Sequence, residues 1–144
     1  MQLRNILARK GRVLHTIGVD GLLGEAVATM SNQDLGSLIV FDGRQMVGIL
    51  TFREVLNTVS RRGPTWAGIK VGSVMLKDPL VGAPSMEIDD LRRMMLETHQ
   101  RYIPVMEDGL LLGVVSFHDV ARAVLDEQQE ENRMLKNYIH DQLA

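Results

Sequence analysis

Hydrophobic residues along this chain follow two spacings, one typical of buried strands and one typical of amphipathic helices. Short continuous apolar runs rich in β-branched residues, such as Ser37–Phe41, predict buried strands. Apolar residues three and four positions apart, such as Ala26 and Met30, predict helices with one face toward a core. By these criteria we expect strands at Ser37–Phe41, Met46–Leu50, Tyr102–Met106 and Leu111–Val115, helices at Gln2–Lys10, Gly24–Ser31, Ile88–Glu97 and from Phe52 and Phe117 onward, and short extended segments at Val13–Ile17 and Leu80–Gly82.

These elements form a unit that occurs twice along the chain. The segment Val47–Val55 aligns without a gap with Leu112–Val120, and the glycines Gly48 and Gly113 lie 65 positions apart. Glycine, phenylalanine and valine recur identically in this alignment, and other aligned pairs keep their side-chain class. The same offset holds upstream, through the preceding strand and helix. This register indicates a duplicated β-α-β-β-α unit.

The duplication suggests how the chain is divided. We expect a first repeat at residues 1–62, a linker at residues 63–70, a second repeat at residues 71–125 and a tail at residues 126–144. The chain has no glycine or proline between Ala121 and Leu143, which predicts that the last helix continues through the tail. One unit alone would bury too little surface for a secure fold, so we expect the two repeats to stack into one module and the module to form a homodimer.

Composition narrows the possible functions. The chain has 144 residues and a formal net charge of −2, which argues against nucleic-acid binding. It contains no cysteine, which excludes disulfides, zinc–thiolate sites, iron–sulfur clusters and cysteine nucleophiles. Its apolar runs are too short to cross a bilayer and its first residues lack the core of a signal peptide, so we expect a cytoplasmic protein. The four histidines lack metal-ligand spacing and no serine lies in a nucleophile-elbow context, so we expect no metal site and no catalytic residues.

Each repeat has a hydroxyl residue followed three positions later by an acid, where a strand meets a helix. These residues are Thr51 and Glu54 in the first repeat, and Ser116 and Asp119 in the second. The unpaired N–H groups at a helix start attract a phosphate, and a carboxylate can accept hydrogen bonds from both hydroxyls of a ribose. The same spacing also describes a capping box that only stabilises the helix start. Spacing alone leaves both interpretations open.

The motifs Gly48–Glu54, Gly113–Asp119, Tyr102–Val105 and Val74-Met75 resemble those of the tandem CBS (cystathionine β-synthase) domain pair. The resemblance extends from about Leu3 to Val124 and is greatest to the stand-alone bacterial type. It implies an α/β (α+β) fold in which tandem β-α-β-β-α repeats form a pseudo-two-fold pair, followed here by a long C-terminal helix. It also implies two clefts between the repeats that bind adenosine-containing ligands, with AMP as the first candidate and ADP, ATP, NAD or S-adenosylmethionine as the others.

In this family, each cleft combines extended segments of one repeat with the hydroxyl and acid of the other. Asp119 matches the family's ribose-binding acid, whereas Glu54 is longer by one methylene group. Only the Glu54 cleft has an arginine, Arg101, a bidentate phosphate donor by type, where the other cleft has Gly36. The resemblance therefore favours ribose recognition at Asp119 and phosphate binding at Arg101. Carried over to this sequence, one cleft combines Thr16, Ile17, Val19, Gly36 and Leu38 with Ser116 and Asp119, and the other combines Leu80, Val81, Arg101, Tyr102 and Ile103 with Thr51 and Glu54.

Three hypotheses for the function follow. The first is a non-catalytic regulatory or sensor module that binds an adenine nucleotide between its repeats and acts on another protein, which the sequence does not identify. The second is a ligand-free structural dimerisation module, suggested by Glu54 and by the bulky Phe52, and favoured if Phe52 and Phe117 fill the seam between the repeats. The third is a small enzyme acting on a nucleotide, which would need a metal-binding acid cluster or a nucleophile–base pair. The sequence shows neither.

Overall fold

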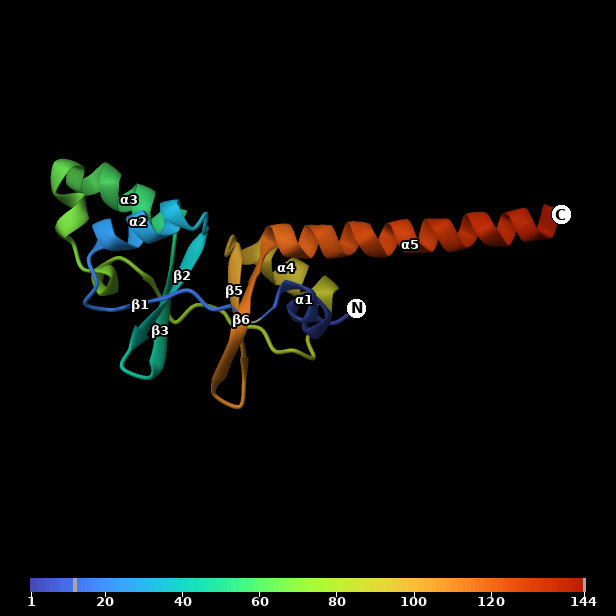
Figure 1. Ribbon diagram of the computed structural model, residues 1–144, viewed down its shortest axis with the longest axis horizontal. Helices are drawn as coiled ribbons and strands as arrows, with labels where there is room; N and C mark the ends of the chain where they lie inside the picture. The colour runs from blue at the N-terminus through green and yellow to red at the C-terminus, as the bar shows by residue number, and fades with distance from the viewer. Residues whose placement is uncertain (12, 144) are drawn as a thin grey trace.

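The computed structural model describes residues 1–11 and 13–143, and its elements follow the expected order along the chain (Figure 1). Each end that was predicted for a helix or strand agrees with the structure to within one residue; for the helices at Phe52 and Phe117 only the start was predicted. The helices are α1 (Leu3–Lys10), α2 (Leu23–Asn32), α3 (Phe52–Arg62), α4 (Ile88–Thr98) and α5 (Phe117–Leu143), with short 3-10 helices at Gly63–Gly68 and Val71–Ser73. The strands are β1 (Thr16–Gly18), β2 (Ser37–Asp42), β3 (Gln45–Thr51), β4 (Leu76–Lys77), β5 (Tyr102–Glu107) and β6 (Leu110–Ser116).

The strands form two small sheets, one in each repeat. The first sheet has the order β1-β2-β3-β4, with β1 parallel to β2 and the other neighbours antiparallel. The second sheet consists of the antiparallel hairpin β5-β6. Gly82 adds an isolated parallel bridge to Val105 beside this hairpin, which corresponds to the pairing of Ile17 with Val40 in the first repeat.

The duplication extends to irregularities of the backbone. A register shift interrupts the β2-β3 ladder between Val40 and Phe41, and an equivalent shift interrupts β5-β6 between Val105 and Met106, 65 positions later. A β-bulge bends its strand and strengthens the local twist. Both hairpins are therefore expected to bend at the same point of the repeat.

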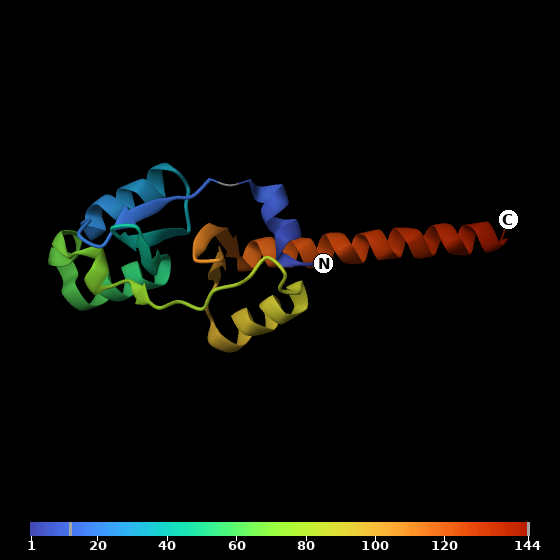
Figure 2. The ribbon, with the colours of Figure 1, turned by 90° about the horizontal axis from the view of Figure 1, so that it is seen from below.

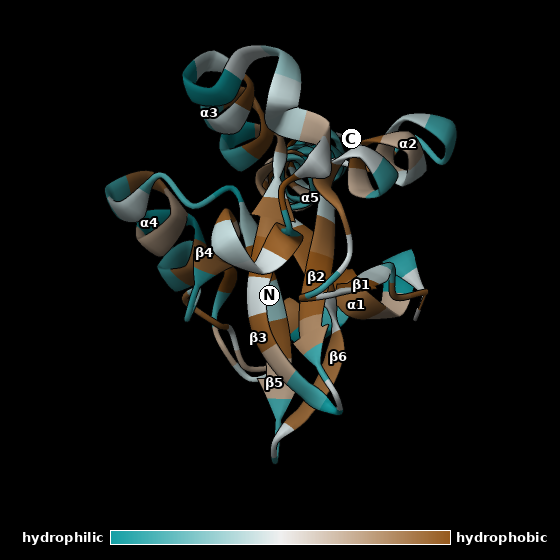
Figure 3. Cartoon of the chain, turned by 90° about the vertical axis from the view of Figure 1, so that its left-hand side faces the viewer, coloured by the Kyte–Doolittle hydropathy of each residue, from teal (hydrophilic) through white to brown (hydrophobic). Residues whose placement is uncertain are grey.

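Two separate hydrophobic cores lie under the helices. In the first repeat, α2 packs on β2 and β3 through Leu23, Met30 and Leu38. In the second repeat, α4 and the start of α5 pack on the β5-β6 hairpin, and Leu91 and Val115 are fully buried. Figure 3 shows the apolar colour concentrated on the strands and the hydrophilic colour on the outward faces of the helices. Each repeat therefore has its own core.

Helix α1 belongs, by its contacts, to the core of the second repeat. Leu3 and Ile6 lie in the same buried cluster as Leu91 and Val115. Figure 2 shows α1 beside the start of α5, away from the remainder of the first repeat. The N-terminal segment thus crosses from one repeat to the other, and its last residues lie at the seam.

The segment between the repeats is also structured. Residues Gly63–Gly68 form a 3-10 helix that contacts α2 and α3, and Trp66 packs against the first core. Downstream, β4 pairs with β3 through Leu76 and Ile49. The chain therefore remains on the first repeat until Lys77, although the boundaries between the repeats stay a prediction.

The tail continues α5 as a single helix that projects from the body of the protein (Figures 1 and 2). Its 27 residues correspond to a length of about 40 Å at 1.5 Å per residue. The first part contacts α1, where Arg9 lies 3.5 Å from Asp126, while Leu135 and Ile139 further out are exposed. Ala144, the last residue of the predicted tail, lies outside the described residues. Among the helices that the structure describes, none is both long and apolar enough to cross a membrane.

Candidate functional site

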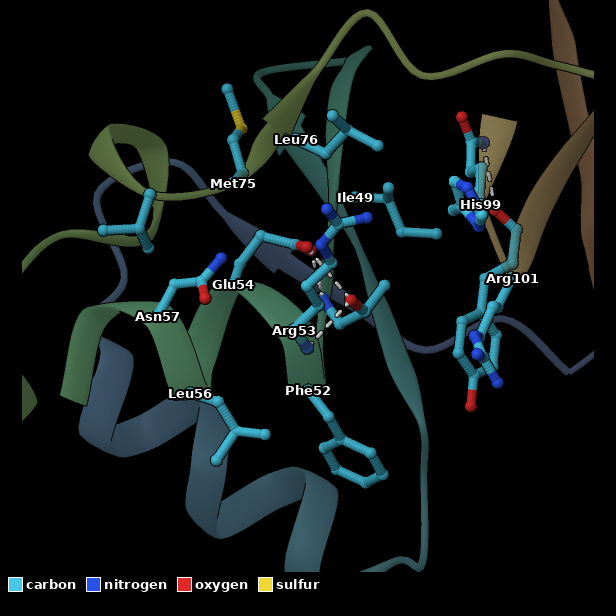
Figure 4. Close-up of a pocket in the computed structure, with 14 residues that line it drawn as sticks. Ile49, Phe52, Arg53, Glu54, Leu56, Asn57, Met75, Leu76, His99 and Arg101 are labelled. Atoms are coloured by element: carbon cyan, nitrogen blue, oxygen red, sulfur yellow. Dashed lines mark hydrogen bonds between the residues drawn. The ribbon is translucent and has the colours of Figure 1, made fainter. Parts of the chain in front are cut away.

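Two clefts open where the repeats meet. The larger one, here called the first cleft, has a volume of about 1010 Å³, while the second cleft has a volume of about 400 Å³. Both volumes lie within or close to the range of about 300–1,000 Å³ that is common for small-molecule sites. Figure 4 shows the first cleft between the start of α3 and the residues that lead into β5. Its lining comprises Ile49, Thr51, Phe52, Arg53, Glu54, Leu56, Asn57, Val74, Met75, Leu76, His99, Gln100, Arg101 and Tyr102.

The junction of β3 and α3 forms the polar wall of the first cleft. Thr51 is the N-cap of α3, and its Oγ1 accepts a hydrogen bond from the Arg53 N–H at 3.2 Å. The Glu54 carboxylate accepts hydrogen bonds from the Thr51 N–H at 2.7 Å and from the Thr51 hydroxyl at 3.1 Å. The capping box is therefore present. Because a carboxylate offers about four acceptor sites, Glu54 can still accept further hydrogen bonds from a ligand.

Burial changes the ionisation of Glu54. Removal of the carboxylate from water raises its pKa above the ordinary value, and the hydrogen bonds from Thr51 offset only part of this effect. A donor that approaches the carboxylate from the cleft would replace some of the lost hydration. The group is thus better suited to accept hydrogen bonds from neutral hydroxyls than a fully solvated acid would be.

Basic side chains line the first cleft on both of its walls. Arg53 is the second residue of α3, and Arg101 and His99 come from the second repeat (Figure 4). Arg101 and Arg53 are both exposed, so their guanidinium groups can reach an anion in the cleft. The first cleft therefore combines an acid of one repeat with arginine side chains from both repeats.

The aromatic residues do not fill the seam. Phe52 lines the first cleft but leaves 54% of its side chain exposed. Phe117 instead packs against the core of the second repeat. Neither phenylalanine fills the seam, which is the arrangement that would have favoured a ligand-free scaffold.

Gln100 is a lining residue that the sequence analysis missed, and it holds the predicted segment around Leu80. Its side-chain oxygen accepts a hydrogen bond from the Leu80 N–H at 3.0 Å, and its amide nitrogen donates to the carbonyls of Leu80 at 2.9 Å and Tyr102 at 3.1 Å. These three bonds tie the chain that enters the second repeat to the start of β5. No motif in the sequence marks Gln100 for this role.

The second cleft is smaller because Tyr102 and the N-terminal segment approach it. A Cβ atom at Gly36 would lie 1.8 Å from the Tyr102 hydroxyl, so the tyrosine ring fits only against a glycine. The Ser116 N–H donates to the Asp119 carboxylate at 2.9 Å, and the Ser116 hydroxyl accepts from the Asp119 N–H at 3.1 Å. This is the same capping box as at Thr51 and Glu54.

Asp119 differs from Glu54 in its charged partner. The Lys10 ammonium lies 2.7 Å from the Asp119 carboxylate and donates a second hydrogen bond to the Val114 carbonyl at 2.9 Å. Burial raises the pKa of Asp119, but the hydrogen bond and charge of Lys10 together with the hydrogen bonds at Ser116 outweigh it, and the pKa lies below the ordinary value.

The structure brings some of the predicted site residues together and leaves others apart. Thr51, Glu54, Arg101 and Tyr102 line the first cleft, and Gly36 and Ser116 line the second, together with Tyr102. Ile103 and Leu38 are buried in the two cores, and Ile17 and Val19 pack against the first core. Four predicted residues line neither cleft: Thr16, Leu80, Val81 and Asp119.

Several lining residues were not predicted as site residues. The first cleft has an apolar wall that includes Ile49, Leu56 and Met75, and the second cleft includes Lys10 and His15. The motif Val74-Met75 was noted in the sequence and could have been used to predict part of this apolar wall. Within residues 1–11 and 13–143, no group of three or more histidine, aspartate or glutamate side chains is arranged to hold a metal ion.

Comparison with known proteins identifies related chains. The CBS domain family model matches residues 10–61 and 71–126. The mitochondrial CBS domain-containing protein CBSX3 of Arabidopsis thaliana is 34% identical over 125 residues, which cover 83% of this chain and 61% of CBSX3. The chain thus spans about three fifths of the length of this curated relative.

Solved structures share the arrangement of the two repeats. The CBS-domain containing protein ATU1752 from Agrobacterium tumefaciens is 31% identical, with a TM-score of 0.83, and the match covers 85% of this chain and 98% of that one. The structure of CBSX2 in complex with AMP is 28% identical, with a TM-score of 0.70 and coverage of 81% and 91%. The pseudo-two-fold pair of repeats expected from the sequence is thereby confirmed.

Proposed function

The chain belongs to the CBS-domain family, and from this premise we propose that it is a non-catalytic regulatory module that binds an adenosine-containing nucleotide between its repeats, with AMP as the first candidate. One observation carries the proposal. The first cleft, with a volume of about 1010 Å³, places Thr51 and Glu54 of one repeat opposite Arg101 and Tyr102 of the other. The AMP bound to the related CBSX2 supports this assignment of ligand class.

Each part of AMP has a suitable partner in the first cleft. The Glu54 carboxylate accepts hydrogen bonds from the ribose hydroxyls, since Glu54 lines the cleft and its two bonds from Thr51 leave acceptor sites free. The phosphate is bound by Arg101 and by the start of α3, where the helix dipole favours negative charge. The base packs on the apolar wall that includes Ile49 and Met75. We propose these roles for all three groups.

Binding in this cleft couples the two repeats, since the acid and Arg101 come from different ones. A nucleotide that contacts both sides favours the relative position of the repeats in which both contacts form. It shifts the protein toward that arrangement only to the extent that it binds it more tightly than the alternative. The recipient of this signal is another protein, which neither the geometry nor the relatives identify.

The proposed function predicts that AMP stabilises the folded chain against thermal unfolding. AMP at about one hundred times its dissociation constant should stabilise the folded chain by about 2.7 kcal/mol, because it binds only the folded state. The melting temperature is measured with AMP, ADP, ATP, NAD and S-adenosylmethionine in parallel, with adenine as a control that lacks ribose and phosphate. An unchanged melting temperature with all five ligands would support the ligand-free dimerisation module instead.

We also propose that the protein is a homodimer. Exposed apolar side chains lie on α3 (Leu56, Val59), on α4 (Leu96) and on the tail (Leu135, Ile139), and a second copy would cover part of this surface. Light scattering at micromolar protein should give about twice the monomer mass of 16.1 kDa. A monomeric mass under these conditions would exclude the homodimer.

A cytoplasmic location remains a prediction from the sequence, and the relative CBSX3 is mitochondrial.

A further inference from the structure

The two clefts differ at the acid that the duplication places in both. In the second cleft, the Asp119 carboxylate is covered by the ammonium of Lys10, which lies 2.7 Å away. The side chain of Asp119 is only 19% exposed, and Lys10 rather than Asp119 is part of the lining of this cleft. Lys10 therefore stands between the acid and any molecule that enters from the seam.

In the first cleft, the charge of Arg53 acts on Glu54, but from more than the 4.0 Å of a salt bridge, so among the described residues no ion pair covers this acid as Lys10 covers Asp119. Within the part of the chain that the structure describes, the hydrogen bonds to the Glu54 carboxylate come from Thr51 alone, and no salt bridge joins Glu54 to a cationic group at 4.0 Å or less. The acid is therefore accessible from the cleft that it lines.

The length of the N-terminal segment explains the difference. Leu7 lies against Gly113 as Met75 lies against Gly48, and Ile17 and Gly82 hold equivalent places beside their sheets. Leu7 and Ile17 are ten positions apart, whereas Met75 and Gly82 are seven apart. The longer segment lets α1 continue to Lys10, whose side chain then reaches across to the start of α5.

From this geometry we infer that Lys10 occupies the ribose-binding position of the second cleft and excludes nucleotide from it, so that each chain binds one nucleotide, in the first cleft. This inference rests on the proposed function. Lys10 and Asp119 are both charged and lie 2.7 Å apart, whereas a ribose hydroxyl brings no charge that would replace the lost ion pair. A nucleotide would also have to free Lys10 from the Val114 carbonyl, and would enter a cleft of about 400 Å³.

A role of Lys10 in binding phosphate is the competing interpretation. The ammonium has three donors, and two of them already point to Asp119 and Val114. Only one donor is left for a phosphate, and the neighbouring Asp119 carboxylate would repel it. The geometry therefore favours exclusion over recruitment.

The test counts AMP sites by titration calorimetry on the full chain. We expect one AMP per chain in the wild type and two in Lys10→Met, which keeps the length of the side chain but removes its charge. Lys10→Gln is a second variant in case Lys10→Met folds poorly. Lys10→Arg, which can keep the ion pair, should retain one site. In a Glu54→Ala background, Lys10→Met should restore binding, and Asp119→Ala should abolish it again.

The outcomes separate this inference from the proposed function. A wild-type chain that binds two AMP molecules, or a Lys10→Met chain that gains no site, would overturn the inference. Loss of a site in Lys10→Met would show that Lys10 recruits the nucleotide and would overturn it as well. A wild type that binds no AMP, with a Lys10→Met variant that gains one site, would contradict the proposed function and the single site in the first cleft, and would support only the exclusion of nucleotide by Lys10.

Discussion

Replacement of Glu54 by alanine is expected to weaken AMP binding by about 10- to 150-fold. The variant removes the carboxylate that we assign to the ribose, and this range corresponds to the loss of one hydrogen bond to a charged group, about 1.5–3 kcal/mol. Loss of the bonds to both ribose hydroxyls would weaken binding further. The affinity is measured by titration calorimetry. Because Glu54 also caps α3, the variant should lose about 0.5–2 kcal/mol of stability, which urea unfolding measures separately.

The chain offers a matched control for this variant. Asp119→Ala removes the equivalent acid and the equivalent capping box in the second repeat, so its cost in helix capping is similar. It should leave the affinity of the wild-type site unchanged, because Lys10 already covers Asp119. If both variants weakened binding equally, Asp119 would also contact the nucleotide, and the inference about Lys10 would be wrong.

Gly48→Ala is expected to destabilise the fold by about 1–3 kcal/mol, the usual range for overpacking a buried position. A Cβ atom at Gly48 would lie 2.6 Å from the Met75 sulfur and 2.7 Å from the Leu76 carbonyl oxygen. The carbonyl is backbone and cannot rotate away, so β4 has to move from β3. Since Met75 and Leu76 line the first cleft, AMP binding should weaken in the same variant.

The second repeat again contains the control. A Cβ atom at Gly113 would meet only the Leu7 Cδ2 atom, at 2.9 Å, and the end of a leucine side chain can change its rotamer. Gly113→Ala should therefore cost less stability than Gly48→Ala in urea unfolding, and it should leave AMP affinity unchanged. Equal losses in the two variants would show that backbone crowding at β4 is not the cause.

Much of the fold was predictable because it depends on short stretches of sequence. The strands expected at Ser37–Phe41 and Met46–Leu50 correspond to β2 and β3 within one residue. The same is true of α4, whose apolar spacing and acidic first turn are local features. The repeat could also be found without a structure, because 65 positions separate matching residues throughout.

The partners of each element could not be predicted in the same way. The apolar stripe of α1 shows that the helix packs on a core, but not that it packs with Leu91 and Val115 of the second repeat. The segment at residues 63–70 was predicted as a linker, and within it Trp66 packs against the first core. A pattern along the chain defines which face is apolar and says nothing about what covers it.

The candidate site also has features that the sequence showed and contacts that only the structure showed. The hydroxyl and acid motifs were visible at Thr51 and Glu54, and the structure places them in a cleft with Arg101. Leu80 and Val81 were predicted to contact the ligand but line neither cleft, and the backbone of Leu80 is paired with the Gln100 amide. These pairings depend on distances between segments, which spacing does not reveal.

The sequence by itself determined that this protein is a duplicated α/β unit with a hydroxyl and an acid at each strand–helix junction, because these features arise from neighbouring residues and a constant offset. Only the tertiary structure decided that a lysine covers one of the two acids. Lys10 and Asp119 are 109 positions apart, and their ion pair forms because α1 crosses to the second repeat and ends beside α5. The duplication gives both strand–helix junctions the same motif, and a contact between distant segments covers the acid of only one of them.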